Sequence, residues 1–372
     1  MDMEMLKRDQ QRIENLQLFN RVEIEAIEQP GGVTVLVMVT ERWFIFPYPI
    51  LYANERDWKK LSYGAGIVHR NFRGRNTNFG LSGWLGYNPG FSLYYANPRI
   101  GGDRHLYLTL KAFSGTVRSR GLEVERFNMT SRGGLIDIGK RWGLYTYTSV
   151  ILSYQSIGFP FQYEYLTAGG ERTDRLPSLA LVFKYDRRDL VEYPKKGLFF
   201  QTYVEKVHYP SQVDYLRSGV DVRFYIPLVA GISLAMRSAG DLLQGDNPMY
   251  ARHYLGYSER IRGHYDQVRQ GDHRLMSQLE LRFPIVSLHY FSVDESMFGP
   301  YSSNMPFALH GAVFAETGTT WSRGEQIDQE RFLSGYGAGI HVQLPYSYVL
   351  RFDYGLNLDG NGEFIFDLNA WF

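Results

Sequence analysis

The sequence has no cysteine among its 372 residues, so disulfide bonds, thiolate metal sites and a cysteine nucleophile are all excluded. It also lacks an apolar run of about 18 residues, the length that a helical membrane span requires. No charge sign dominates, because 40 basic and 39 acidic side chains leave a net charge of +1. Without an excess of positive charge to attract phosphate groups, no nucleic-acid partner is expected.

Motifs of common enzyme classes are missing as well. The sequence has no HExxH metalloprotease motif, no P-loop, no GxSxG nucleophile motif and no glycine-rich dinucleotide fingerprint. Nine histidines and many serines would formally allow a catalytic triad. However, His253, His264 and His273 lie in or beside one predicted loop, as polar loop or lumen residues would. We expect no enzymatic activity, no catalytic residue, no metal and no cofactor.

Aromatic residues and glycines are abundant, with 28 Tyr, 24 Phe, 6 Trp and 38 Gly. From residue 43 onward, runs of about ten residues alternate between polar and apolar side chains with period two. In residues 346–357, for example, Leu350, Phe352 and Tyr354 lie on one face, and Arg351 and Asp353 lie on the other. About ten residues is the length at which a tilted strand crosses the hydrocarbon layer of a bilayer.

This alternation predicts an all-β fold, a transmembrane antiparallel β-barrel of about 16 strands in residues 43–372. A soluble antiparallel sheet alternates in the same way, but charges of both signs on the polar face of strand after strand favour a wet lumen. An even number of strands closes the sheet and leaves no edge that lipid cannot satisfy. The expected strands are residues 44–53, 59–69, 76–87, 91–98, 104–115, 130–142, 143–156, 177–186, 197–208, 213–226, 229–240, 272–285, 306–318, 332–344, 346–357 and 363–372.

Two connections between these strands stand out by their length. The largest loop, residues 241–271, joins the eleventh and twelfth expected strands. The link formed by residues 287–305 falls at the other end of the barrel by strand parity. It therefore breaks the expected division into short turns at one end and long loops at the other.

Residues 1–42 have a different pattern, with a helix expected in 4–19 and two strands in 22–27 and 33–40. Such a unit is too small to bury a good core alone. The N-terminus is charged and polar, so no signal peptide is expected at this position. For an exported barrel, the export signal would have been removed or would lie upstream of the numbering. Residues 1–42 look like the end of a larger module. The rest of that module would either precede this sequence or come from a partner.

Segments spread over nearly the whole chain resemble the BamA/TamA superfamily of outer-membrane insertases and secretion transporters. These proteins place periplasmic POTRA modules before a sixteen-stranded barrel. The segment Ile261-Arg262-Gly263-His264 is similar to the family's (V/I)RG(F/Y) loop motif, with His264 in the aromatic position and Tyr265 following it. Other segments resemble the end of the last POTRA module (LFNRVEIEAI, VTVLVMVTERW), two periplasmic turns (NFRGRN; KYDRRD with YPKKG) and the twelfth and thirteenth strands (QLELRFP, VFAETGTTW).

The resemblance implies that residues 1–42 are a partial α/β POTRA-like segment and that the large loop folds back into the lumen. An arginine that enters a barrel interior loses water and needs carboxylate partners in fork geometry. Glu280 and Glu316 lie on the predicted lumenal faces of their strands. We therefore expect a loop lock in the lumen, formed by Ile261, Arg262, Gly263, Glu280 and Glu316. The alternative interpretation is a solvated loop arginine beside a wet channel.

In this superfamily the first and last strands meet at a seam. Pro47 and Pro49 lie in the first expected strand, and proline is confined to strand edges or bulges because it cannot donate to a ladder. They predict a poorly sealed seam, although prolines at a strand entrance would give the same pattern. The terminal Phe372 resembles the C-terminal signal of outer-membrane barrels. The expected seam residues are Phe44, Phe46, Tyr48, Phe366, Leu368, Ala370 and Phe372.

The resemblance implies an outer-membrane assembly or insertion factor that takes up client strands at the seam by β-augmentation. The alternatives are a two-partner-type secretion pore and a passive porin or structural barrel. The expected partners are the outer-membrane lipid bilayer, unfolded β-barrel clients and accessory periplasmic or outer-membrane subunits. The expected location is a Gram-negative-type outer membrane, with the N-terminus in the periplasm.

Overall fold

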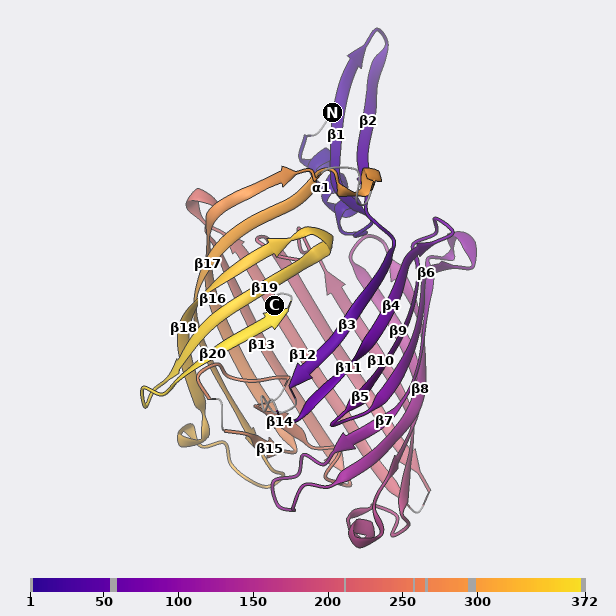
Figure 1. Cartoon of the computed structure of the whole chain (residues 1–372), viewed down its shortest axis with the longest axis vertical. Helices are drawn as coiled ribbons and strands as arrows, with labels where there is room; N and C mark the ends of the chain where they lie inside the picture. Colours follow the sequence, from indigo (N-terminus) through magenta and orange to yellow (C-terminus); the bar gives the residue numbers. More distant parts are fainter. Residues whose placement is uncertain are drawn as a thin grey trace.

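The protein is a barrel formed by one sixteen-stranded antiparallel sheet, with a small N-terminal unit at one end (Figure 1). The computed structural model describes residues 3–53, 59–210, 212–256, 258–264, 267–293 and 299–368. The prediction of an all-β barrel of sixteen strands is confirmed. In chain order the strands are β3 (Ile45–Ala53), β4 (Leu61–Phe72), β5 (Thr77–Gly86), β6 (Gly90–Ile100), β7 (Leu106–Arg118), β8 (Asn128–Trp142), β9 (Thr146–Gly158), β10 (Thr173–Asp186), β11 (Gly197–Tyr209), β12 (Val213–Pro227), β13 (Ser233–Gly245), β16 (His273–Phe291), β17 (Met305–Trp321), β18 (Leu333–Leu344), β19 (Tyr348–Asn357) and β20 (Gly362–Leu368).

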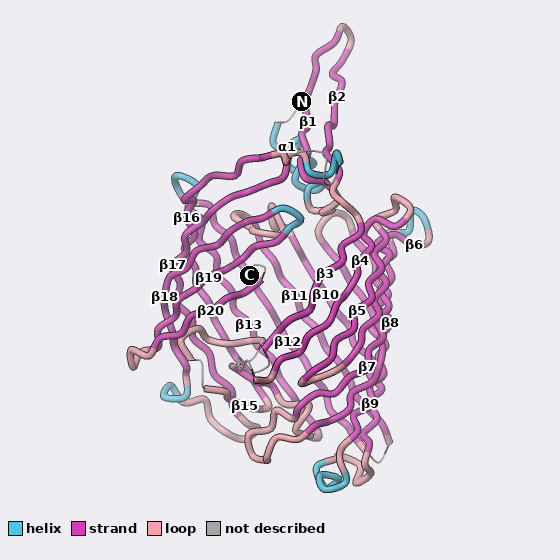
Figure 2. Tube along the Cα trace, viewed as in Figure 1, coloured by secondary structure: helices cyan, strands magenta, loops and turns pink. Residues whose placement is uncertain are grey.

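Strand makes up nearly the whole wall of the barrel, and the described helices are α1 and short 3-10 turns (Figure 2). Among the described residues, no helix is both long and apolar enough to cross a bilayer.

The two faces of the sheet have opposite character. In β19, Phe352 and Tyr354 are 37% and 52% exposed on the outside, whereas Arg351 and Asp353 are buried inside. The same outward exposure of large apolar side chains recurs around the wall, for example at Leu81, Ile136, Leu152, Leu181, Val220, Leu279, Val313 and Ile340. A charged interior and an apolar exterior invert the pattern of a soluble protein and match a wall that contacts lipid.

The extra length of β16 and β17 differs from the prediction in a way that matters for the fold. β16 continues to Phe291 instead of ending at residue 285, and β17 begins at Met305. The expected long link at 287–305 is therefore shortened at its ends to the residues between Phe291 and Met305, because the two strands stay paired beyond the wall. Their pairing register shifts between Pro284 and Val286 and again before His289. These irregularities interrupt the polar–apolar alternation on which the strand prediction relied.

The N-terminal unit, residues 3–42, consists of α1 (Met3–Glu14) and the hairpin of β1 (Phe19–Gln29) and β2 (Gly32–Glu41). The helix is shorter than predicted because the chain turns after Glu14 and Gln17 has a left-handed φ of 58°. Leu6 and Val22 are buried, while the hairpin projects away from the barrel (Figure 1). One helix and one hairpin do not establish a POTRA module, which stays a prediction.

β3 and β20 are the two edges of the sheet, and within the described residues no backbone ladder joins them. Pro47 and Pro49 pair with β4 as part of β3. Half-buried Phe44 precedes β3, and Phe46 and Tyr48 are half-buried within it. On β20, Phe366 and Leu368 are exposed on the outside. Ala370 and Phe372 lie outside the described residues.

Because the outer face is apolar and the lumenal face is polar, an introduced charge should destabilise the barrel much more on the outer face. We expect Leu181→Arg, on the outward face of β10, to lower the free energy of unfolding in lipid by about 2–4 kcal/mol. The control Gln201→Arg, on the lumenal face of β11, should cost much less. Urea titration of the heat-modifiable, folded form in liposomes measures both, and equal losses would contradict a lipid-facing exterior.

Candidate functional site

The loop between β13 and β16, residues 246–272, folds back inside the barrel. It contains two short paired strands, β14 (His253–Leu255) and β15 (Arg269–Gly271). Ile261 is only 2% exposed and packs in an apolar cluster with Leu255, Met276 and Leu333. This cluster attaches the middle of the loop to β16 and to the start of β18.

Arg262 follows Ile261 and makes ion pairs with carboxylates from three strands. Its Nε donates to Glu316 Oε1 at 2.8 Å, its Nη1 to Asp353 Oδ2 at 2.7 Å and its Nη2 to Glu280 Oε2 at 3.2 Å. Its backbone N–H donates to the other oxygen of Glu316 at 2.9 Å. Loop and wall are thus joined by charge-assisted hydrogen bonds in the planar fork geometry that only arginine offers.

An aromatic ring completes the environment of this guanidinium. Its central carbon lies 3.4 Å from the centre of the Phe314 ring, which is itself buried in β17. A cation against an aromatic face is attracted by the negative π surface of the ring, and more strongly where water is excluded.

Two of the three carboxylates, Glu280 and Asp353, are shared with two further arginines. Arg351 Nη2 donates to Glu280 at 2.7 Å and to Asp353 at 3.1 Å, and Arg282 Nε donates to Glu280 at 2.7 Å. We call these six side chains the arginine–carboxylate cluster: Arg262, Arg282, Arg351, Glu280, Glu316 and Asp353. All six are nearly inaccessible to solvent. Three positive and three negative charges balance, which is the condition under which ions tolerate a buried site.

Electrostatics hold Arg262 in its charged form. Burial would lower the pKa of the Arg262 guanidinium, but the charges of Glu316, Glu280 and Asp353 outweigh burial and raise this pKa above its ordinary value. The arginine therefore stays cationic at any physiological pH.

The backbone beside Arg262 requires glycines. Gly263 has a φ of +98°, and a Cβ there would lie 2.5 Å from the carbonyl carbon of Leu356. A Cβ on Gly335 in β18 would overlap the carbonyl oxygen of Arg262. The loop thus lies directly against the wall, which side chains at these two positions would prevent.

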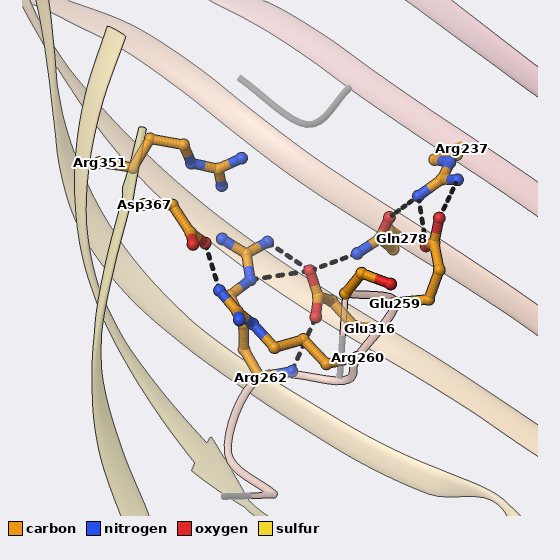
Figure 3. Close-up of a pocket in the computed structure, with 9 residues that line it drawn as sticks. Arg237, Glu259, Arg260, Arg262, Gln278, Glu316, Arg351 and Asp367 are labelled. Carbon is orange, nitrogen blue, oxygen red and sulfur yellow. Dashed lines mark hydrogen bonds and ion pairs between the residues drawn. The ribbon is translucent and has the colours of Figure 1, made fainter. Parts of the chain in front are cut away.

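The same loop holds the edge strand β20. The backbone N–H of Gly263 donates to Glu363 at 2.8 Å, and Arg260 forms an ion pair with Asp367. On the opposite wall, Glu259 pairs with Arg237 of β13 at 3.0 Å. Figure 3 shows the loop residues between these two walls, around a small cavity of about 30 Å³.

On the other side of the cluster, a turn from the N-terminal end of the barrel enters the lumen. Tyr193 lies between β10 and β11 and is 1% exposed. Its ring stacks on the His310 ring, with 4.5 Å between the two ring centres. Its hydroxyl lies 2.9 Å from His341 Nδ1, and His341 Nε2 lies 3.3 Å from Asp353. Contacts therefore continue from this turn through the lumen to Arg262.

The structure brings together all five residues expected at the loop lock. His264, in the aromatic position of the motif, instead places its Nε2 2.9 Å from the carbonyl oxygen of Ser334. Tyr265 lies outside the described residues. Burial lowers the pKa of His253 in the same loop to about 4, so its ring is neutral.

Sequence reasoning missed Asp353, Arg351 and Arg282 as members of the site. All three lie on the predicted lumenal faces of their strands, which was the available signal. His341 also lies on the lumenal side of its strand, opposite exposed Ile340. Tyr193 carried no signal of this kind, because its contact joins a turn to a strand 148 residues away.

The fork geometry predicts that charge alone cannot replace Arg262. We expect Arg262→Ala to leave buried carboxylates unpaired and to lower the free energy of unfolding by about 3–5 kcal/mol. Arg262→Lys should recover only a minor part, because an ammonium cannot serve three carboxylates in a plane. The exposed Arg175→Lys is the control, and urea unfolding in liposomes is the measurement. A lysine variant as stable as the wild type would contradict a requirement for the planar fork.

The close approach of the loop to the wall gives a second prediction. Gly263→Ala should displace the loop and expose residues 246–272 to trypsin added to intact, folded barrels. Gly240→Ala in β13 is the matched control, since a Cβ there meets no atom closer than 3.5 Å. If Gly263→Ala resists trypsin as well as Gly240→Ala does, the loop does not depend on this contact.

Comparison with solved structures shows the same fold in three proteins of this architecture. BamA from Haemophilus ducreyi lacking POTRA domains 1-3 aligns with a TM-score of 0.62 and 16% identity, over 98% of this chain and 77% of that one. CdiB from Escherichia coli aligns with a TM-score of 0.61 and 13% identity, over 99% and 70%. CdiB from Acinetobacter baumannii aligns with a TM-score of 0.57 and 14% identity, over 96% and 67%. No curated protein matches the sequence. The model of the Omp85 superfamily domain matches residues 71–370, and the chain therefore belongs to the Omp85 superfamily of outer-membrane β-barrels.

Proposed function

We propose that this chain is an outer-membrane assembly factor of the BamA/TamA type, which takes up strands of unfolded β-barrel clients at the seam between β3 and β20. The N-terminal unit would then lie in the periplasm. The observation that carries the proposal is the unpaired edge: β3 and β20 end the sheet without a ladder between their described residues.

An unpaired edge has a strong physical consequence in lipid. Backbone N–H and C=O groups that find no partner in hydrocarbon cost several kcal/mol each. A client strand that adds to β3 or β20 satisfies these groups, and its apolar face enters the lipid at the same step. The free energy of client folding drives the process, so the proposal assigns no nucleotide, metal, cofactor or catalytic residue to the chain.

The inward-folded loop favours uptake of a client at the seam over passage of a client through the lumen. The loop occupies the part of the interior beside the arginine–carboxylate cluster, which is charge-balanced and nearly inaccessible. A passenger moving through this part of the lumen would first have to displace Arg262 from three carboxylates. A passive porin would need the same space open at all times.

A secretion pore is the second candidate, and the similarity to CdiB favours it. The TM-scores to BamA and to E. coli CdiB, 0.62 and 0.61, do not separate the two. In this alternative the loop leaves the lumen during transport, and the client contacts the inner wall. Either function would involve accessory periplasmic or outer-membrane subunits as partners.

Site-specific photocrosslinking separates the two routes. A photoreactive residue at Phe366 on β20 should capture a urea-denatured barrel client during its folding into liposomes. The same residue at Leu181 should not, although the two positions are equally exposed, 57% and 58%. A third probe at the lumenal Gln201 tests the alternative. Capture at Gln201 without capture at Phe366 would contradict uptake at the seam and support a secretion pore.

The rate of client folding is measured in the same liposomes. We expect the protein to accelerate the appearance of the heat-modifiable, folded client relative to empty liposomes, with low and irregular ion conductance. Steady conductance with no acceleration would instead indicate a passive pore.

A further inference from the structure

The extensions of β16 and β17 form a hairpin that leaves the wall at the N-terminal end of the barrel. β16 pairs with β13 only as far as Arg282, and β17 begins its pairing with β18 at Ala308. We call residues 283–293 and 299–307, which lie beyond these points, the rim hairpin. In Figure 1 the rim hairpin passes over the ends of β18 and β19 and reaches the base of β1 and β2.

The described tip of the rim hairpin is fixed to the N-terminal unit by hydrogen bonds. Asn20, which is 5% exposed, donates from Nδ2 to the carbonyl oxygens of Tyr301 and Ser303 at 2.9 and 3.0 Å. Asn304 Nδ2 donates to Thr40 Oγ1 at 3.1 Å. These contacts reach both strands of the N-terminal hairpin.

Aromatic contacts extend this attachment to the start of β3. The Tyr301 ring meets the rings of Trp43 and Phe44 edge-on, with ring centres 5.2 and 6.2 Å apart. Trp43 and Phe44 directly precede β3, so the tip holds the first residues of one sheet edge. Tyr346, in the turn between β18 and β19, adds a second contact of this kind, because its ring lies 5.1 Å from Phe46 of β3.

The other sheet edge, β20, is attached through the loop at the opposite end of β16. The loop that precedes β16 binds β20 through Gly263 to Glu363 and Arg260 to Asp367. The hairpin that follows β16 binds the segment before β3. Both edges of the seam are therefore tied to β16, although they are not paired with each other in the described residues.

We propose that the rim hairpin is a brace across the seam, which sets the spacing between β3 and β20 while its tip is docked on the N-terminal unit. Undocking of the tip frees β3 to move away from β20, and movement of the N-terminal unit is transmitted to the seam. This inference concerns the geometry of the seam and holds whether the passenger is a membrane-inserted client or a secreted protein.

Pulsed spin-label distance measurement tests the brace without any client. The chain has no native cysteine, so nitroxides at Leu51→Cys and Phe366→Cys report the β3–β20 distance in lipid nanodiscs. We expect Tyr301→Ala combined with Asn20→Ala to shift the distances to longer and broader values. Leu288→Ala is the control, since Leu288 is an exposed rim-hairpin residue outside the described tip contacts. A distribution unchanged by the tip variant would overturn the proposal, and client crosslinking at Phe366 would remain a separate result.

A crosslinked variant covers the case in which the tip variant does not fold. Thr40→Cys and Asn304→Cys, joined through two thioethers by a short bismaleimide, should slow hydrogen exchange in β3 relative to the same protein without the reagent. The control pair is Ser238→Cys and Ser277→Cys, whose native hydroxyl oxygens lie 3.0 Å apart between β13 and β16. Protection of β3 that is no greater than in the control pair would also overturn the proposal.

Discussion

The structure depends on one buried ion cluster, in which Arg262 of an inward-folded loop contacts carboxylates from β16, β17 and β19. Removing ions from water is costly, and only near-complete pairing offsets that cost. Arg282 and Arg351 supply the remaining pairing through Glu280 and Asp353. The barrel therefore has a solid, charge-balanced interior on the side of the wall that includes its last strands.

This buried cluster explains how a sheet whose two edges are unpaired in the described residues keeps its shape. The loop that carries Arg262 also binds β20, and the rim hairpin binds the segment before β3. Over the part of the seam that the structure describes, contacts made from within the lumen and from the N-terminal end take the place of backbone pairing. Such contacts hold the edges in place and leave their hydrogen-bonding groups available to a third strand, which is what uptake at a seam requires.

The sequence predicts much of the wall and part of the site. Period-two alternation gives the number of strands and their faces, so Arg351 and Asp353 fall on the correct side. It cannot say which inward residues meet across the lumen, because that depends on the curvature and stagger of the whole sheet. Arg262, Glu280 and Glu316 were found through a motif resemblance. The rim hairpin was missed because register shifts after Pro284 break the alternation, and the POTRA-like nature of residues 1–42 stays a prediction.

The most direct test of the central ion cluster is a double-mutant cycle between the loop and the wall. The free energies of unfolding in liposomes are compared for Arg262→Met, Glu316→Gln and the double variant. Because the two side chains are in direct contact and nearly buried, we predict a coupling energy toward the upper end of about 0.5–3 kcal/mol. Strictly additive effects of the two substitutions would contradict the claim that this pair holds the loop inside the barrel.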